Sequence, residues 1–248
     1  MSHTAVPDDH PRSASLRTRH RIEAGIDAGI TSRQGLIAEG RGEAFDYLIG
    51  ERTIESAAAA ERAAAAHLLR AESPVVSVNG NVAALAPEAV VDLADATDAA
   101  IEVNLFNRTE ARMNAIADHL RDHGASEVKG LTADARIPGL SHERGKVDAD
   151  GIGAADVVLV PLEDGDRAAA LAEMGKTEIV IDLNPLSRSP QAAAVPVVDN
   201  LVRALPAITE HARDLRDRPE EWDAIIENFD REAALADAER AIRSGQLD

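Results

Sequence analysis

From residue 74 onward, short apolar segments alternate with helical segments, and this alternation constrains the fold more than any other feature of the chain. Strands are predicted at residues 74–78, 100–105, 155–160, 177–182 and 195–198, and helices near residues 87–97, 109–123, 164–175 and 200–214. Short apolar strands separated by helices are typical of a parallel sheet with helices on both faces. The sequence therefore predicts an α/β core over residues 73–212.

Helical segments flank this core. Residues 13–72 have apolar side chains at helical spacing and alanine-rich stretches that favour helix, although Gly35, Gly40 and Gly42 are expected to interrupt this region. We expect residues 1–212 to form one domain, to which residues 213–248 add a C-terminal helical extension.

The extension is predicted to be a charged amphipathic helix after Pro219. It contains the only tryptophan, Trp222, which we expect to pack on the body of the protein or on a partner subunit. Residues 124–154 form a long irregular segment, and a loop of that length in a compact domain is usually functional.

The charge of the chain limits its partners. It has 44 acidic and 26 basic residues and a net charge of −18, which argues against nucleic-acid binding. An acidic chain with lysine only at positions 129, 146 and 176 is typical of a halophilic cytoplasm, where dense salt screens self-repulsion. A cluster of basic residues therefore carries more information here than an acidic run.

Several classes of protein are disfavoured by what the sequence lacks. Without cysteine there is no disulfide, thiolate catalysis or cysteine-ligated zinc. No apolar run reaches about 18 residues, and the first residues do not resemble a secretory signal, so we expect a cytoplasmic protein without a membrane segment. The usual glycine fingerprints of dinucleotide-binding and P-loop proteins are also absent.

Polar residues instead follow the predicted strands. Asn79, Gly80 and Asn81 come directly after the first strand. An Asn-Gly pair is often a hairpin turn, but a helical segment follows, so the pattern indicates a strand, a tight turn and a helix. The free backbone N–H groups of such a turn could hold an anion or a substrate, or the segment could be a plain connection.

The later strand ends repeat this pattern. The candidates are Asn104 and Arg108, then Glu163 and Asp164, then Asp182, Asn184, Arg188 and Ser189, and finally Asp199 and Asn200. Ligands of open parallel sheets bind at this edge. Glu163 and Asp164 could hold Mg²⁺ or a substrate ammonium group, or could complement a helix dipole. Thr109 is predicted to be a helix N-cap, and N-capping is also the simple explanation for Asp199 and Asn200.

One arginine and one group of basic residues also stand out on this acidic chain. Arg41 lies between two glycines, where a guanidinium could bind phosphate or could mark a flexible helix junction. In the long loop, Arg136, Arg144 and Lys146 could bind phosphate or carboxylate, or could pair with neighbouring acids. His142 in the same loop is more typical of a surface histidine than of a catalyst.

Seven blocks taken together resemble the archaeal 4-phosphopantoate–β-alanine ligases, also called phosphopantothenate synthetases. The blocks, in order over residues 8–212, are HPRSASLRTRHRI, GLIAEGRGEAFDYLIGERT, PVVSVNGNVAAL, EVNLFNRTE, RIPGLSHERGKV, ADVVLVPLEDGDR and IDLNPLSRS with VVDN. The resemblance implies a Rossmann-like homodimer that uses ATP and Mg²⁺. It implies the conversion of ATP, 4-phosphopantoate and β-alanine to AMP, diphosphate and 4′-phosphopantothenate. The tail from about residue 213 lies outside it.

The resemblance also implies site residues. Its ATP-contacting positions fall on Arg19, Arg41, Asp182, Leu183, Asn184, Arg188, Ser189, Asn200 and Leu201. Ligation of this kind needs positioning and charge neutralisation more than a protein nucleophile. We therefore expect the catalytic groups to be Arg41, Arg188, Asn79 and Asn81. For the other substrates the charges favour Asn104, Arg108, Arg136, Arg144, Lys146, Glu163 and Asp164, and no metal ligand is assigned.

Other interpretations remain open from the residues alone. The acid could be activated as an acyl-adenylate, with AMP released, or as an acyl-phosphate, with ADP released. A non-enzymatic nucleotide-binding regulatory module would need the same strand ends, although not the basic loop. An NAD(P)-dependent oxidoreductase is disfavoured by the missing glycine fingerprint.

Overall fold

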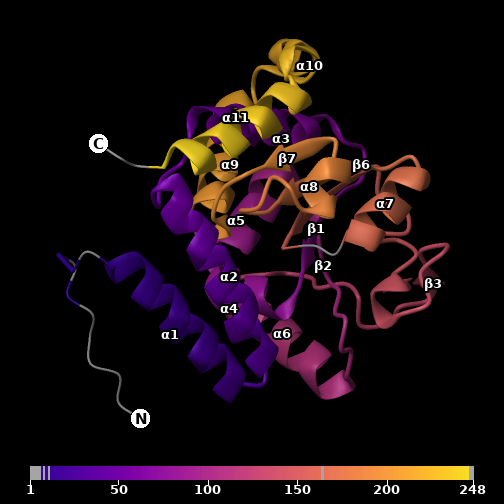
Figure 1. Cartoon of the computed structure of the whole chain (residues 1–248). Helices are drawn as coiled ribbons and strands as arrows, with labels where there is room; N and C mark the ends of the chain where they lie inside the picture. Colours follow the sequence, from indigo (N-terminus) through magenta and orange to yellow (C-terminus); the bar gives the residue numbers. More distant parts are fainter. Residues whose placement is uncertain (1–6, 8, 11, 163–164, 246–248) are drawn as a thin grey trace.

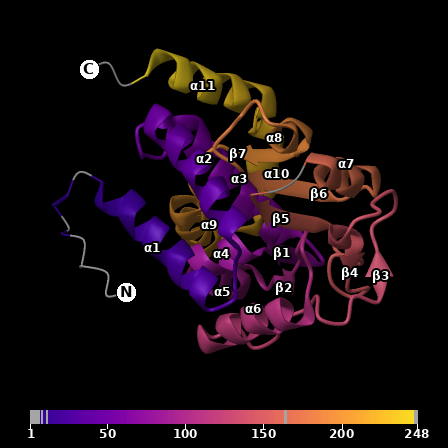
Figure 2. The same ribbon diagram turned by 60° about the horizontal axis from the view of Figure 1, so that its bottom comes forward.

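A five-stranded parallel sheet forms the centre of the molecule in the computed structural model, which describes residues 7, 9–10, 12–162 and 165–245 (Figure 1). The strands are β1 (Pro74–Val78), β2 (Ala100–Val103), β5 (Val157–Pro161), β6 (Thr177–Ile181) and β7 (Val195–Val197). They lie in the order β2-β1-β5-β6-β7, as Figure 2 shows. The predicted α/β class and parallel sheet are confirmed.

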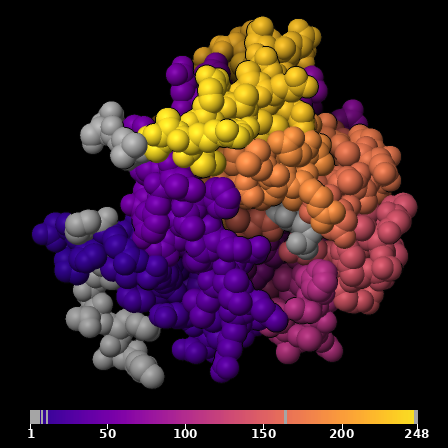
Figure 3. Space-filling model, in the orientation of Figure 1, coloured from indigo at the N-terminus to yellow at the C-terminus, as the bar shows by residue number. Residues whose placement is uncertain are grey.

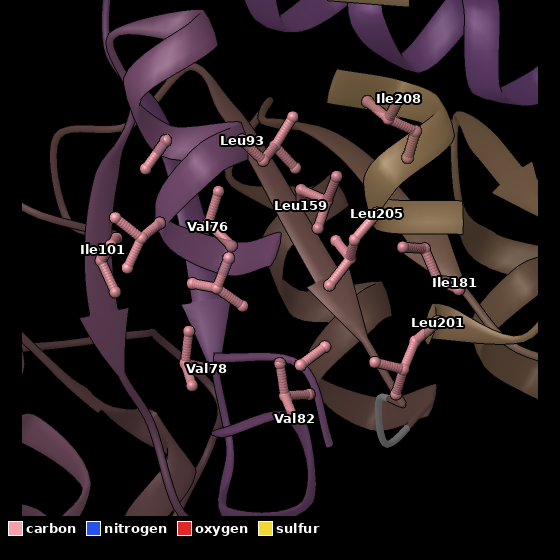
Figure 4. Packing of buried hydrophobic residues seen from close by; sticks show 14 of the residues in the cluster. Val76, Val78, Val82, Leu93, Ile101, Leu159, Ile181, Leu201, Leu205 and Ile208 are labelled. Atoms are coloured by element: carbon pink, nitrogen blue, oxygen red, sulfur yellow. The ribbon is translucent and has the colours of Figure 1, made fainter. Parts of the chain in front are cut away.

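One face of the sheet carries the main core. It is covered by α3 (Glu55–Arg70), α5 (Pro87–Thr97) and α9 (Leu201–Leu215). Alternate strand residues such as Val76 and Leu159 point to this face and meet Leu93 and Leu205 of the helices (Figure 4). The small alanines of α3 allow close packing, and Ala60 and Ala63 to Ala66 are fully buried.

The opposite face is covered differently. There α7 (Gly165–Glu173) and the segment before β5 pack on the other alternate residues, among them Val75, Val158 and Val160. The segment contains a small antiparallel hairpin of β3 (Ala135–Arg136) and β4 (Lys146–Val147), joined through a 3₁₀ turn, η1 (Glu143–Gly145). The predicted irregular loop is therefore partly ordered by this hairpin. Its strands have only two residues each, too few to be recognised from the sequence.

The N-terminal helices lie to one side of the sheet (Figure 2). They are α1 (Ser13–Asp27) and α2 (Arg33–Ile49), and the connection after β1 is the short helix α4 (Gly80–Leu85). The expected interruptions of α2 at Gly35, Gly40 and Gly42 were wrong, because this helix is continuous. The remaining helices of the core are α6 (Glu110–Asp122), which begins at the predicted cap Thr109, and α8 (Arg188–Ala192).

The C-terminal residues form two helices rather than one. These are α10 (Pro219–Asn228) and α11 (Arg231–Ser244), and both pack on α3. Trp222 packs against the main core and donates its indole N–H to the Leu215 carbonyl at 2.9 Å. Leu235 of α11 joins a small cluster with Ile49 and Leu183. The extension therefore packs on the body of the same chain.

In the part of the chain that the structure describes, no helix combines the length and the apolarity needed to cross a membrane.

Candidate active site

The carboxyl ends of the five strands meet at one edge of the sheet, because all five are parallel. Chain order reverses direction between β1 and β5, and ligands of such sheets bind at this switch point. Figure 3 shows the surface indented between the purple region that contains α2 and the orange region that contains α8. The predicted polar strand ends therefore come together on one side of the molecule.

The turn after β1 is held by its own asparagines. Asn79 Oδ1 accepts hydrogen bonds from the backbone N–H groups of Asn81 and Val82 at 3.0 and 3.1 Å, so Asn79 caps α4. Its amide donates to the Pro161 carbonyl at the end of β5, at 3.2 Å. The side chain thus fixes the two strands on either side of the switch point.

Asn81 is buried and connects this turn to α2. Its amide donates to the Gly35 carbonyl at 3.0 Å, and its Oδ1 accepts from the Thr31 hydroxyl at 2.6 Å. The side chains of both asparagines are bound within the protein, so they hold this turn in place. A direct catalytic role for them stays a prediction.

The predicted nucleotide-binding residues gather where α2 crosses the ends of β6 and β7. Arg41 is exposed on α2, and its charge acts on Asp182 directly after β6. Burial raises the pKa of Asp182, and the Asn184 backbone N–H, the Ser187 hydroxyl and Arg41 counteract part of that rise. Leu183 is 5% exposed and lies under Gly42 of α2. This side of the edge offers an exposed cation beside a half-buried carboxyl group.

Asn184 and Asn200 each order the backbone around them. Asn184 Oδ1 accepts from the Leu186 backbone N–H at 3.0 Å. Asn200 caps α9 by accepting from the Val202 N–H at 3.2 Å, which confirms its capping role, and Leu201 is buried behind it. Asp199 does not cap α9: its Oδ1 accepts from the Asn200 backbone N–H at 2.7 Å.

Arg19 and Arg188 are the two other arginines predicted to contact ATP. Arg19 of α1 forms a two-point pair with Glu43 of α2, at 2.7 and 2.6 Å, two residues from Arg41. Arg188 is exposed at the start of α8 and packs against Gly165, where an added Cβ would lie 2.4 Å from the Arg188 Cβ. Ser189 beside it is 2% exposed.

Glu43 has partners that the sequence did not indicate. Arg12 and Tyr47 also bind its carboxylate, at 3.2 and 2.5 Å. Burial alone would raise the pKa of Glu43, but the hydrogen bonds from Arg19, Tyr47 and Arg12 outweigh it and lower the pKa. The ion pair joins α1 to α2 beside the exposed Arg41.

The predicted basic loop forms a second cluster at the end of β2. Arg136 and Lys146 face each other across the β3–β4 hairpin, and Lys146 pairs with Glu143 at 2.8 Å. Lys146, then Arg108 and Arg136, lower the pKa of Glu143. The cluster therefore sets several cations around one carboxylate.

Asn104 fastens this cluster to the sheet. It is 1% exposed, and its amide donates to the Arg144 and Lys146 carbonyls at 3.1 and 3.0 Å. Arg108 donates to the Leu131 carbonyl at 3.2 Å, and Arg136 to the Leu140 carbonyl at 2.7 Å. These arginines therefore stabilise the loop by hydrogen bonds and also give it positive charge.

Leu162 follows β5 directly, at the same edge of the sheet. Glu163 and Asp164, predicted to hold Mg²⁺ or an ammonium group, lie outside the described residues. Leu162 before them adopts a positive φ of 57°, a conformation that costs a leucine about 1–3 kcal/mol and that concentrates at functional sites. Its backbone N–H bonds to the Ile181 carbonyl at 2.9 Å, which holds the strained residue at the switch point.

Comparison with known proteins identifies the family of the chain. The sequence model of the phosphopantothenate/pantothenate synthetase family matches residues 56–245, more than half of the chain. The chain belongs to the phosphopantothenate/pantothenate synthetase family. The match includes α10 and α11, although the resemblance seen in the sequence ended near residue 212.

Relatives of this synthetase family align with nearly the whole chain. A Methanosarcina mazei protein named 4-phosphopantoate–β-alanine ligase is 57% identical over 236 residues, which cover 95% of this chain and 93% of the relative. Proteins of the same name from Thermococcus onnurineus and Thermococcus kodakarensis are 57% and 54% identical over 240 residues, which cover 96% of this chain and 92% of each relative.

This synthetase-family chain also has a buried carboxyl pair that the sequence did not reveal. Glu61 of α3 is 1% exposed, and burial, followed by the charge and the hydrogen bond of Asp199, raises its pKa to about 8. Asp199 also accepts from the Thr53 hydroxyl at 2.5 Å and from Arg203 Nε at 3.0 Å. The one signal in sequence is the spacing of Asp199 and Arg203, an i,i+4 ion pair at a helix start.

We expect Glu61→Gln to remove a pH dependence of stability. Because folding raises the pKa of Glu61 from about 4.5 to about 8, the stability that its protonated form contributes is complete below about pH 4.5 and is lost as the pH rises through about 8. Glutamine mimics the protonated acid. As the pH rises from 5 to 9, the melting temperature of the variant should therefore increase relative to that of the parent.

The control for this prediction is Glu55→Gln, at an exposed position on the same helix. Its melting temperature should differ from the parent by a constant amount over the same pH range. A constant difference for Glu61→Gln as well would show that Glu61 does not hold a proton in the folded protein.

A dedicated metal site is not evident in the synthetase fold as far as the structure describes it. Within residues 12–162 and 165–245, no group of three or more histidine, aspartate or glutamate side chains is placed to hold a metal ion.

Proposed function

We propose that this protein is an ATP-dependent ligase that condenses 4-phosphopantoate with β-alanine to give 4′-phosphopantothenate in coenzyme A biosynthesis. One observation carries the proposal: relatives with that printed name are up to 57% identical over 95% or more of the chain. We place the enzyme in the cytoplasm as a homodimer, and Mg²⁺ would enter with the phosphates of ATP.

The reaction that fits this site proceeds through an acyl-adenylate. A carboxylate oxygen of 4-phosphopantoate attacks the α-phosphorus of ATP, and diphosphate leaves. The amine of β-alanine then attacks the acyl carbon, and the C–O bond breaks to release AMP. Both steps need charge neutralisation and alignment, which arginines and ordered backbone supply without a protein nucleophile.

The nucleotide would bind along α2 and the ends of β6 and β7. Arg41 and Arg188 are exposed there, so each can reach a phosphate without breaking a described hydrogen bond. Asp182 and Asn184 lie in an ordered turn that could orient the nucleoside, because the carboxylate bonds to the Asn184 N–H at 2.9 Å. Arg19 would act beside Arg41 while it remains paired with Glu43.

The acid and amine substrates would bind on the β2 side of the switch point. The cations Arg108, Arg136 and Lys146 surround one carboxylate, so this cluster carries excess positive charge on a strongly acidic protein. Such a cluster suits the phosphate of 4-phosphopantoate or the carboxylate of β-alanine. Glu163 or Asp164 would hold an ammonium group or the Mg²⁺ that ATP brings.

The direct test is an endpoint assay in molar KCl with Mg-ATP, 4-phosphopantoate and β-alanine, read by mass spectrometry. 4′-Phosphopantothenate should form only when all three substrates are present. Binding of ATP to the folded protein without product in any mixture would instead favour a nucleotide-binding module without this chemistry.

We also propose that the protein is adapted to high salt. Its net charge of −18 is repulsive in dilute buffer and screened above about 1 M salt. The melting temperature should therefore rise markedly between dilute buffer and molar KCl. The same melting temperature in both solutions would contradict the halophilic assignment.

A further inference from the structure

Four charged and polar side chains meet at the start of α9. Asp46 of α2 is 8% exposed at its side chain, and Asp199, after β7, is fully buried. Arg203, one turn into α9, lies between the two carboxylates. Asn200, at the start of α9, contacts both acids.

Arg203 bridges the two carboxylates through several charge-assisted hydrogen bonds. Its Nη2 and Nη1 donate to the two oxygens of Asp46 at 2.6 and 3.1 Å. Its Nε donates to Asp199 Oδ1 at 3.0 Å, and Nη2 also reaches that oxygen at 2.5 Å. Such a planar fork binds two carboxylates in one fixed arrangement, which a lysine cannot reproduce.

Both carboxylates in turn hold Asn200. Asp46 Oδ2 accepts the Asn200 amide at 2.8 Å, and Asp199 Oδ1 accepts the Asn200 backbone N–H at 2.7 Å. The Asn200 Oδ1 is used by the cap of α9. The backbone and the side chain of Asn200 are therefore both held in place. The two carboxylates that hold them, those of Asp199 and Asp46, are both bound by Arg203.

We propose that Arg203 is a positioning residue for nucleotide binding, which acts by locking Asp46 and Asp199 around Asn200 at the start of α9. This inference rests on the proposed function and on the ATP contacts of Asn200 and Leu201 that the family resemblance implies. Arg203 reaches the nucleotide through Asn200 and not directly.

A purely structural ion pair is the competing explanation, and it predicts a different result. Changing one partner of a buried ion pair usually destabilises a protein, because the other charge stays buried without its partner. A structural role would lower the melting temperature of an Arg203 variant and leave its affinity for ATP unchanged. A positioning role would weaken ATP binding in protein that is still folded.

The test compares Arg203→Lys with Arg213→Met, a control at an exposed position on the same helix, 3.9 Å from Asp92. Arg203→Lys should raise the Kd for ATP by calorimetry, and the KM for ATP, about tenfold, the cost of one charge-assisted hydrogen bond, with a smaller change in kcat. Arg213→Met should leave both constants within about twofold of the parent, as for most surface changes.

A double-mutant cycle shows whether Arg203 acts through Asn200. Because both changes remove the same positioned group, Asn200→Ala with Arg203→Lys should bind ATP no more than about twofold more weakly than Asn200→Ala alone. If Arg203→Lys does not fold, Asp46→Asn weakens the same lock and should give the same rise in Kd.

The outcomes separate this inference from the proposed function. Parent protein that binds ATP and makes product, with an unchanged Kd in folded Arg203→Lys or Asp46→Asn, would overturn the positioning role alone. Additive losses in the cycle would overturn it as well. Parent protein that does not bind ATP would overturn the proposed function.

Discussion

Arg41→Met should lower kcat/KM for ATP by about a hundredfold or more, while the protein stays folded. In the proposed reaction Arg41 neutralises ATP phosphates as charge develops, and removing one such donor typically costs about 10²–10³ in rate. The side chain is exposed on α2, so its loss leaves no cavity in the core. Steady-state kinetics with ATP varied, together with the melting temperature, measures both effects.

The same variant should change the pH dependence of the reaction. Arg41 lowers the pKa of Asp182, which burial otherwise raises. Without this cation the pKa of Asp182 should rise further, so the acidic limb of the kcat/KM profile should move to higher pH. A loss of rate with an unmoved profile would place Arg41 away from Asp182 during catalysis.

The matched control is Arg33→Met, which removes an exposed arginine from the same helix. Eight residues separate the two positions, about 12 Å along the helix axis. Arg33→Met should keep kcat/KM within about twofold of the parent. Equal losses in both variants would point to a general electrostatic effect on an acidic protein rather than to a phosphate contact.

Gly35→Ala should destabilise the protein by about 2–4 kcal/mol, the range for overpacking that also breaks a buried hydrogen bond. An added Cβ would lie 2.3 Å from Asn81 Oδ1 and 2.7 Å from Thr31 Oγ1. These two atoms form the hydrogen bond that joins the turn after β1 to the N-terminal helices. Denaturant unfolding in molar KCl measures the change in the free energy of unfolding.

Gly40→Ala is the control within the same helix. An added Cβ at Gly40 meets no atom within 4 Å. Replacing this helical glycine should therefore stabilise the protein by about 0.5–1 kcal/mol. If both variants destabilise the protein equally, the contact of Gly35 with Asn81 is not what limits stability there.

The sheet and the polar edge formed by its strand ends could be predicted because their signals are local. Each strand is a short apolar run rich in valine and isoleucine, and parallel pairing then places every strand end on one edge. Asp182 and Asn200 could be assigned to that edge without knowledge of their partners. The cap at Thr109 was equally local, since its bond to the Arg112 N–H spans only three residues.

The contacts that hold the site together could not be predicted because they join distant parts of the chain. Asp46 binds Asn200 and Arg203, which are 154 and 157 residues away in the sequence. No periodic pattern in the sequence predicts such a contact. The continuity of α2 was missed for a related reason. Gly35 suggests a helix break. In the folded protein, a glycine is needed there because any side chain would collide with Asn81.

The most direct test of the proposed ligation follows the oxygen of the acid. 4-Phosphopantoate labelled with ¹⁸O in its carboxylate is incubated in molar KCl with Mg-ATP, β-alanine and the parent protein. If the acid is activated as an acyl-adenylate, one labelled oxygen appears in AMP for each 4′-phosphopantothenate formed. Unlabelled AMP, or ADP with the label in inorganic phosphate, would contradict that mechanism.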